Sequence, residues 1–348
     1  MFKENIIAEL KKKIQIDPNN IENYKNLANY YVGSDDLNSA LAVYKDILRL
    51  YPNDYQSLIN IGSIYFYKKM YLEALDSYNK SAKIEPNNYV TFYNLGNVYA
   101  EIENFEQALS NYEKALELNP DNPDIFRALG YLYKDIDNLE EAKRNYLKAI
   151  SIDSSNPEDY INVANIEQKM NDEHSALINY EKAYNLNPQD PKAVLCLANS
   201  YSSVKNFKKA QEFFKKTIEL DPNYYSAWVC RAIACCDENN QQEAMIYLKQ
   251  AIELNPNKSN AYVLLANILV DEKRFDEALI IYKTVQKLLP DNPKISAFIA
   301  NTYIMLNNIA QAVRYYKKAM QQAPKDNEIK LIYLELMDDF IKSKKEVM

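Results

Sequence analysis

Glycine and histidine are nearly missing from this chain. Its 348 residues include four glycines, one histidine and one tryptophan. So little glycine disfavours a β-rich fold and favours helices joined by tight turns. A Gly-rich loop that could cradle phosphates is missing as well. The single histidine, His174, is expected on the solvent side of a helix, so neither a His-based catalytic triad nor a histidine-rich metal site is predicted.

Cysteine is also scarce, and its spacing fits no chemical site. Cys196, Cys230, Cys235 and Cys236 show neither an extracellular disulfide pattern nor the spacing of zinc ligands. Free thiols in a reducing compartment are the simplest interpretation, and a soft-metal or redox patch is the alternative. We therefore predict no metal and no cofactor.

Long apolar runs and an excess of basic residues are missing too. The first residues, MFKENIIAELKKK, carry charges where a signal peptide needs an apolar core. No later run reaches the roughly 18 to 20 apolar residues of a membrane span. The net charge of −7 and the pI near 5.1 disfavour nucleic acid and anionic membrane as partners, because both require a basic face. These absences predict a cytoplasmic, non-enzymatic protein without membrane insertion.

What the chain does contain is a unit that recurs every 34 residues. Its marker is proline at a spacing of 34: Pro18, Pro52, Pro86, Pro120, Pro188, Pro222, Pro256, Pro290 and Pro324. Only Ser154 interrupts this series, and the four other prolines each lie three residues beyond one of its positions. A period this strict, without insertion, predicts a stacked array of repeats rather than a globular domain.

Each unit has the hydrophobic pattern of two helices. In the unit 89–122, the large and small residues of the two helices are Phe92, Leu95, Gly96 and Tyr99, then Phe105, Ala108, Tyr112 and Ala115. Positions are counted from the first residue of each unit, so that Gly96 stands at position 8 and Ala108 at position 20 of this one. Position 8 is Gly or Ala in all nine units, and position 20 is always Ala. Small residues on both helices permit close antiparallel packing, with the aromatic residues filling the space around them.

The turns between units are equally regular. Proline at position 32 ends the second helix. Two residues later stands an Asn or Asp that can cap the next helix: Asn20, Asp54, Asn88, Asn122, Asn156, Asp190, Asn292 and Asp326.

This pattern of aromatic-x2-Leu-Gly-x2-Tyr, then Ala, Tyr, Ala and Pro, resembles the tetratricopeptide repeat family. The resemblance implies an all-α fold, a right-handed α-solenoid of antiparallel helix pairs. Nine repeats are expected, at 21–54, 55–88, 89–122, 123–156, 157–190, 191–224, 225–258, 259–292 and 293–326. Residues 1–20 are expected to form an N-terminal capping helix, and residues 327–348 a C-terminal capping helix and tail.

Units five and seven depart from the pattern. Unit five follows the missing proline and carries Glu167 and Glu173 where core aromatic residues are expected. Unit seven carries Arg231, Cys235 and Gln241 at core positions. Drift in a unit that its neighbours stabilise is one interpretation, and a local softening or bend of the superhelix is the other.

The resemblance also implies a binding surface. In this family the first helices line a concave groove, and positions 2, 5, 6, 9, 12 and 13 point into it. Asparagine recurs at two of these positions: Asn29, Asn97, Asn165, Asn199, Asn267 and Asn301 at position 9, and Asn26, Asn60, Asn94 and Asn162 at position 6. An Asn amide both donates and accepts, so such a ladder can hold the main chain of an extended peptide whatever its side chains. The pattern is similar to the asparagine ladder of O-linked N-acetylglucosamine transferase, although an Asn-rich composition is an alternative explanation.

A narrower resemblance concerns peptide carboxylates. Chaperone-binding members of the family grip a C-terminal carboxylate with five residues from three consecutive repeats. Lys25, Asn29 and Asn60 match the first three of these, but Val90 and Asn94 stand where two cations are needed. Without those cations a carboxylate loses most of its charge-assisted contacts, so this clamp is not predicted.

The groove changes character along the chain. Its first half adds Tyr93, Arg127 and Tyr131 to the asparagines. Its second half is apolar, with Val229, Ile233, Val263, Leu264 and Phe298. The apolar part could hold an amphipathic helix, self-associate, or pack within a tight superhelix. Because the fold makes few demands on them, Asn94, Asn97, Asn162 and Asn165 are all expected to be exposed.

These patterns predict a non-enzymatic protein-interaction scaffold that binds an extended or helical protein segment in its concave groove. Two alternatives remain open: a structural solenoid that forms homo-oligomers, and an adaptor subunit of a glycosyltransferase-type complex. A protein or peptide is the expected partner, and a monomer is the preferred oligomeric state.

Overall fold

The chain is an all-α solenoid, as the sequence predicts. The computed structural model describes residues 2–346, which form twenty helices and no strand. The chain divides into two compact units, Met1–Asp172 and Glu173–Met348, and each is described by itself. None of the helices in the described part is long and apolar enough to cross a membrane.

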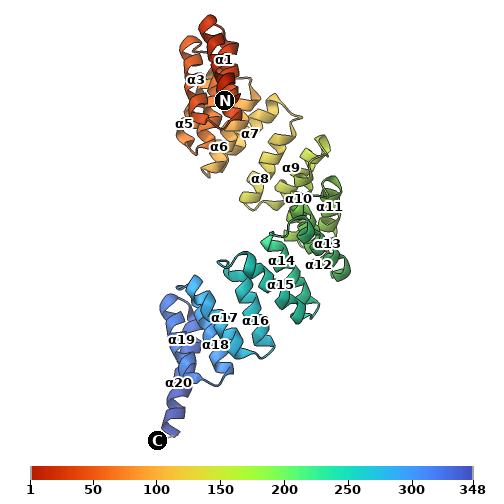
Figure 1. Cartoon of the computed structure of the whole chain (residues 1–348), viewed down its shortest axis with the longest axis vertical. Coiled ribbons are helices and arrows are strands. Elements are labelled where there is room, and N and C mark those ends of the chain that lie inside the picture. Colours follow the sequence, from red (N-terminus) through yellow and green to blue (C-terminus); the bar gives the residue numbers. More distant parts are fainter. Residues whose placement is uncertain (1, 347–348) are drawn as a thin grey trace. The chain divides into compact units, whose positions relative to one another are not determined.

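The first unit is a stack of helices in chain order, coloured red to yellow-green in Figure 1. Its helices are α1 (Phe2–Ile16), α2 (Ile21–Gly33), α3 (Leu37–Leu50), α4 (Tyr55–Tyr67), α5 (Tyr71–Ile84), α6 (Tyr89–Glu101), α7 (Phe105–Leu118), α8 (Pro123–Asp135), α9 (Leu139–Ile152) and α10 (Pro157–Lys169). The largest contacts join α2 with α3, α4 with α5, α6 with α7 and α8 with α9. Each such pair is one repeat, and every pair also touches the next.

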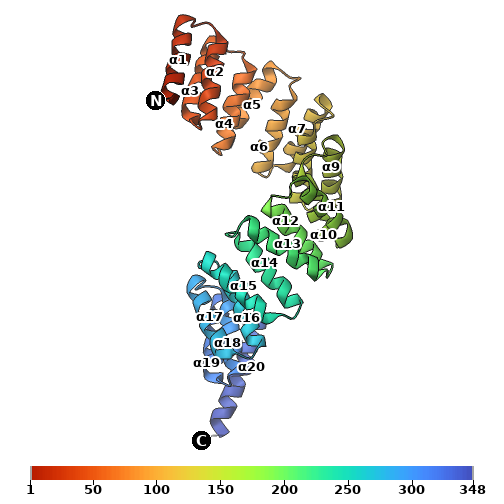
Figure 2. The same cartoon turned by 45° about the vertical axis from the view of Figure 1, so that its right-hand side comes forward.

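The second unit repeats this arrangement, as the green to blue helices of Figure 2 show. Its helices are α11 (Glu173–Leu186), α12 (Pro191–Ser203), α13 (Phe207–Leu220), α14 (Tyr225–Asp237), α15 (Gln241–Leu254), α16 (Ser259–Asp271), α17 (Phe275–Leu288), α18 (Pro293–Met305), α19 (Ile309–Gln322) and α20 (Asn327–Glu346). The pairs α12 with α13, α14 with α15, α16 with α17 and α18 with α19 make its largest contacts.

The predicted N-caps are confirmed. All eight side chains accept a hydrogen bond from a backbone N–H in the first turn of the following helix. Asn88, for example, accepts from the N–H of Thr91 at 3.2 Å. Pro123, Pro157, Pro191 and Pro293 lie in the first turn of their helices, where a missing N–H costs little.

The turn inside each repeat contains a left-handed residue. At position 15 the backbone φ lies between 55° and 62° at nine non-glycine residues: Asp35, Lys69, Glu103, Asp137, Asn171, Lys205, Asn239, Lys273 and Asn307. The residue after it donates its N–H back into the first helix, as Asn104 does to the carbonyl of Tyr99 at 2.9 Å. This is the Schellman motif, which usually has glycine at the left-handed position.

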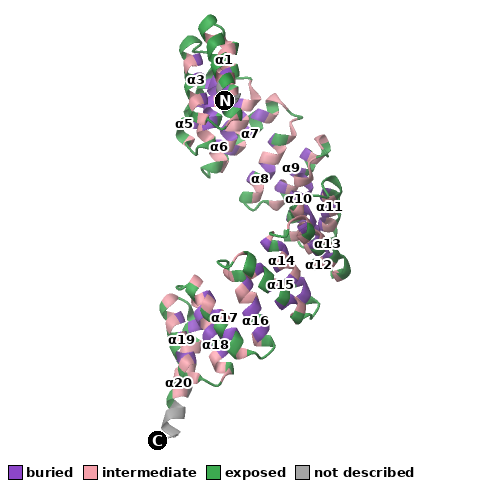
Figure 3. Cartoon of the chain, viewed as in Figure 1, coloured by how far each residue is buried: buried purple, intermediate pink, exposed green. Residues whose placement is uncertain are grey.

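In three repeats of the first unit, a tyrosine ring at position 24 packs directly against a glycine at position 8. At Gly96, an added Cβ would lie 2.5 Å from ring carbons of Tyr112, and Gly62 and Gly130 meet Tyr78 and Tyr146 in the same way. Position 20 is alanine with no exposed surface in every repeat, as at Ala108. Figure 3 shows the buried residues along every helix pair, with exposed turns at their ends. The predicted small-residue packing is therefore confirmed.

The two atypical repeats, five and seven, are well packed. In repeat five, α10 buries eight residues. One of them is Glu167, whose carboxylate pairs with the ammonium group of Lys143 at 2.8 Å. In unit seven, the Arg231 guanidinium lies 4.2 Å from the ring centre of Tyr247, and Cys235 is buried. The substitutions are compensated locally, which favours drift over softening. His174 is exposed, as predicted.

Candidate functional site

The asparagines at position 9 have a structural task. In four repeats the tyrosine at position 24 donates its hydroxyl to the Oδ1 atom of the position-9 asparagine, over 2.5 to 3.1 Å: Tyr44 to Asn29, Tyr112 to Asn97, Tyr282 to Asn267 and Tyr316 to Asn301. These rings are 2 to 3% exposed, and burial raises the pKa of all four hydroxyls, that of Tyr282 to about 12. A buried hydroxyl without a partner costs about 1–3 kcal/mol, so the asparagine stabilises its repeat.

Two of the exceptions support this pairing. Where position 9 is Ser63, its hydroxyl bonds to that of Tyr78 at 3.1 Å. Where position 9 is apolar, in unit seven, position 24 is apolar as well, with Ile233 and Leu248. In unit four, position 9 is Tyr131, and the hydroxyl of Tyr146 is buried without a hydrogen-bond partner among the described residues.

The structure therefore corrects one premise of the sequence interpretation. Packing does make a demand on position 9, because the Oδ1 atom serves the tyrosine. What remains for a ligand is the amide Nδ2 group with its two N–H donors. Within residues 2–346, the Nδ2 groups of Asn29, Asn267 and Asn301 donate no hydrogen bond. The side chain of Asn97 also bonds to Tyr93, and this hydrogen bond opposes the rise that burial causes in the pKa of Tyr93.

The first helices of each unit carry two hollows at equivalent repeat positions. We call the surface made by positions 2, 5, 6, 9, 12 and 13 of successive first helices the first-helix face. Four hollows open on it, each between the first helices of consecutive repeats and each beside a position-9 asparagine. Their volumes are about 390 Å³ (repeats one and two), 470 Å³ (three and four), 500 Å³ (six and seven) and 340 Å³ (eight and nine). Each is also lined by the position-24 ring of the earlier repeat.

Most predicted site residues of the first unit lie on this face. Asn29 and Asn60 line the first hollow, and Tyr93, Asn97, Arg127 and Tyr131 line the second. The side chains of Asn26 and Asn165 are exposed, but they line neither hollow, and nor does Asn94. Asn94 and Asn97 were expected to be exposed, and this is wrong, because both are half-buried.

Two predicted residues of the first unit are already engaged. Lys25 pairs with Asp54 at 3.3 Å, so the first member of the carboxylate-clamp pattern is neutralised. Asn162 was expected to be exposed, and this is wrong. It is 6% exposed, because it lies between packed helices and donates from Nδ2 to the hydroxyl of Tyr131 at 3.2 Å.

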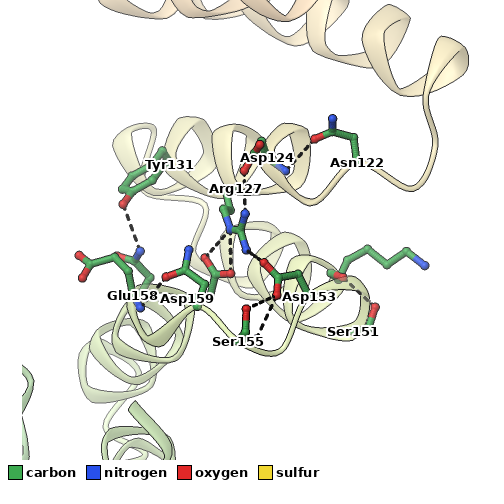
Figure 4. Close-up of polar contacts among 12 residues, drawn as sticks. Asn122, Asp124, Arg127, Tyr131, Ser151, Asp153, Ser155, Glu158 and Asp159 are labelled. Atoms are coloured by element: carbon green, nitrogen blue, oxygen red, sulfur yellow. Dashed lines mark hydrogen bonds and ion pairs between the residues drawn. The ribbon is translucent and has the colours of Figure 1, made fainter. Parts of the chain in front are cut away.

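Arg127 is held by three carboxylates (Figure 4). Its Nε atom donates to both oxygens of Asp159, at 3.0 and 2.8 Å, its Nη2 to Asp153 at 2.9 Å and its Nη1 to Asp124 at 2.6 Å. Burial opposes the charge of Arg127, but these hydrogen bonds outweigh it and raise its pKa. Hydrogen bonds from Ser155 and Arg127 lower the pKa of Asp153 to about 2, whereas burial raises that of Asp159. Arg127 thus ties α8 to α10 and to the turn after α9.

In the second unit the predicted residues divide in two groups. Asn199 and Ile233 line the third hollow, and Asn267, Phe298 and Asn301 line the fourth. Val229 was predicted in the apolar half of the groove, but it is 6% exposed and packs within the core, so its side chain is not available to a ligand. Val263 and Leu264 are half-buried and pack against the same core.

Sequence reasoning missed two sets of residues in the hollows. The first is the ring at position 24, Tyr44, Tyr112, Phe214 or Tyr282. Its signal was the joint variation of positions 9 and 24, which lie 15 residues apart. The second is an acidic residue at position 13, Glu101, Asp135, Asp237 or Asp271, whose recurrence was visible in the sequence.

Family models match most of the chain. Models of the tetratricopeptide repeat match residues 55–88, 77–110 and 96–137. The model described as the cilia and flagella-associated protein 70 C-terminal domain matches residues 140–346, more than half of the chain. This chain belongs to the tetratricopeptide repeat family. Within it, residues 140–346 belong to the family of the cilia and flagella-associated protein 70 C-terminal domain.

Solved tetratricopeptide repeat structures share the fold. A repeat protein of Parabacteroides merdae has a TM-score of 0.56 at 20% identity, over 71% of this chain and 98% of that one. The C-terminal part of a repeat protein of Cytophaga hutchinsonii has a TM-score of 0.51 at 19% identity, over 78% and 97%. The pilF protein of Pseudomonas aeruginosa has a TM-score of 0.51 at 19% identity, over 59% and 93%. No curated protein matches the sequence.

Membership of this family sets the general role. Tetratricopeptide arrays are protein-interaction scaffolds that are generally non-catalytic, and repeat arrays bind through extended surfaces built from successive units. The first-helix face, with its hollows, is one surface of this chain that is built from successive repeats.

Proposed function

We propose that this chain binds an extended or helical segment of a partner protein along its first-helix face. The observation that carries the proposal is the recurrence of a hollow at the same repeat positions in both units. Within each unit, two equivalent hollows suit a ligand that presents several side chains to one side. An extended strand presents every second side chain to one side, and a helix presents every third or fourth.

The asparagines supply a second, less specific contact. With Oδ1 engaged by tyrosine, the free N–H donors of Asn29, Asn267 and Asn301 can bind main-chain carbonyl groups of the ligand. Such contacts hold a peptide whatever its sequence. The side chains that enter the hollows then determine which peptide is preferred.

The second unit offers apolar anchoring sites. Ile233 is 43% exposed and Met305 is 57% exposed, and Met305 lies beside Phe298 and Val270 in the fourth hollow. An apolar side chain of the ligand that covers these groups is removed from water, at about 25 cal/mol per Å² of apolar surface. The segment bound here therefore carries apolar residues.

The experiment uses a random 12-residue peptide display library selected against the full chain. Selected peptides are tested by fluorescence anisotropy against two variants that fill a hollow, Ala100→Trp in the second and Ser203→Trp in the third. Ser110→Trp and Glu212→Trp are the matched controls, because both residues are exposed on second helices, α7 and α13.

We expect at least one hollow-filling variant to weaken peptide binding by at least tenfold, and the controls to leave Kd within twofold. Circular dichroism checks that all four variants keep their helical content. If the control variants weaken binding as strongly, or the hollow-filling variants leave it unchanged, the ligand lies on another surface and the proposal is wrong.

A further inference from the structure

The hollow between repeats three and four differs from the other three in charge. We call it the Tyr93 hollow. It is lined by three carboxylates, Glu101, Asp124 and Asp135, whereas each of the others has one: Asp35, Asp237 or Asp271. The Tyr93 hollow is therefore the most acidic of these four hollows.

The one cation in its lining does not balance this charge. The guanidinium of Arg127 already binds Asp124, which lines the hollow, and Asp153 and Asp159, which lie behind it. One positive charge thus faces three carboxylates in the cluster alone. Glu101 and Asp135 add two further carboxylates at position 13 of consecutive repeats, and both are exposed. The Asp135 carboxylate has no ion-pair partner among the described residues.

The same hollow is also the richest in aromatic rings. Phe66, Tyr93, Tyr112 and Tyr131 contribute to its lining, and the rings of Tyr93 and Tyr112 lie 6.1 Å apart at 47°. A ring face attracts a cation that lies within about 6 Å of its centre. The chain itself uses this contact nearby, because the ammonium group of Lys134 lies 4.5 Å from the ring centre of Tyr131.

We propose that the Tyr93 hollow takes the cationic side chain of an arginine or lysine in the bound segment. The aliphatic part of that side chain lies against the rings, and its charged end binds the carboxylates of Glu101 and Asp135. Charge-assisted hydrogen bonds of this kind are stronger than neutral ones, and a guanidinium can make two in parallel. The inference rests on the proposed function, since it names the side chain that one hollow of the first-helix face selects.

A site for a cationic side chain is the opposite of a carboxylate clamp, which binds an anionic peptide end. Val90 and Asn94 stand where the clamp needs cations, and Lys25 is paired with Asp54. An acidic peptide end would meet the carboxylates of the Tyr93 hollow and be repelled. A basic residue within the segment is instead attracted by the same carboxylates.

The test uses peptides selected by the full chain from the 12-residue display library. In each peptide that contains arginine, that residue is replaced by citrulline, which has the same shape without the charge. Both forms are titrated by anisotropy against the wild type, against Glu101→Gln/Asp135→Asn, and against Glu113→Gln/Glu117→Gln. The last variant makes the same change of charge at two exposed residues of α7.

We expect the citrulline peptide to bind the wild type at least tenfold more weakly than the arginine peptide. The Glu101→Gln/Asp135→Asn variant should lose at least tenfold for the arginine peptide and less than threefold for the citrulline peptide. The α7 variant should change neither Kd by more than twofold. This combination separates a specific contact from general attraction to an acidic protein.

Two outcomes overturn the inference, and they are distinguishable. If selected peptides bind and Ala100→Trp or Ser203→Trp weakens them, but citrulline makes no difference, the first-helix face binds peptides and the Tyr93 hollow does not select a cation. If neither tryptophan variant affects any selected peptide, the proposed function fails together with the inference.

Discussion

At the scale of single residues, this chain couples a buried hydroxyl to a surface amide. The tyrosine at position 24 needs an acceptor, and the asparagine at position 9 provides it from the first-helix face. One residue therefore serves the core with its oxygen and leaves its N–H donors for a ligand. The recurrence of asparagine is explained by this hydrogen bond to tyrosine, and the proposed binding uses N–H donors that the hydrogen bond leaves free.

This coupling predicts opposite effects for one substitution at two sites. Tyr112→Phe removes a hydroxyl that donates to Asn97 at 2.7 Å, and should cost about 0.5–1.5 kcal/mol. Tyr146→Phe removes a hydroxyl that is buried without a partner among the described residues, and should leave stability unchanged or raise it by up to about 1 kcal/mol. The urea midpoint of unfolding, followed by circular dichroism, measures both.

The two tyrosines are close controls for each other, because both fill position 24 against a glycine at position 8. Asn199 opposite Phe214 in unit six shows that a repeat tolerates phenylalanine there. Equal losses of stability in the two variants would mean that the ring, not the hydroxyl, accounts for the effect, and would contradict the coupling.

The residue scale is also where sequence reasoning was least complete. It placed Asn29, Asn97 and Tyr131 on one helix face by counting positions within a period. It could not find the partner of each amide, because a hydrogen bond to a residue 15 positions away depends on how two helices pack. Burial of Asn162 and Val229 was missed for the same reason: contacts with neighbouring repeats do not follow from the period of one helix.

At the scale of elements, the sequence was far more informative. Each sequence signal predicts one local feature. Proline at position 32 ends a helix, the Asn or Asp two residues later caps the next helix, and small residues at positions 8 and 20 permit close helix packing. All of them describe the same helix pair, and the structure has that pair. The turn inside the repeat was the exception, since nothing in the sequence marks it with glycine.

That turn offers a way to stabilise the protein. Glu103 has a φ of 58°, a region that costs a residue with a Cβ about 1–2 kcal/mol and glycine much less. Glu103→Gly should therefore raise stability by up to about 1 kcal/mol, after the entropy that glycine loses on folding. Differential scanning calorimetry should show a higher Tm.

The control for this prediction is Asn239→Gly at the equivalent position, with a φ of 59°. Asparagine already tolerates the left-handed region, so its replacement should change Tm much less. A fall in Tm for Glu103→Gly would show that the side chain makes a stabilising contact that outweighs its backbone conformation.

At the scale of the whole molecule, the 34-residue period supports both the family assignment and the proposed binding surface. The 34-residue period repeats each side chain at an equivalent place, so a hollow formed once is formed again in other repeats. In our proposal, differences between hollows determine the specificity, such as the three carboxylates of the Tyr93 hollow and the side chains of Phe298 and Met305 in the fourth. The period was visible in the sequence, and the hollows were not, because they depend on two neighbouring helices.

The measurement that tests this account most directly is photo-crosslinking of a selected peptide to the full chain. p-Benzoyl-phenylalanine is placed at Ser203 or Met305 on the first-helix face, and at Ser110 or Glu212 on second helices, all of them exposed. We predict crosslinks to the peptide from Ser203 or Met305, and none from the other two. Crosslinks from Ser110 or Glu212 without any from the first-helix face would contradict the account.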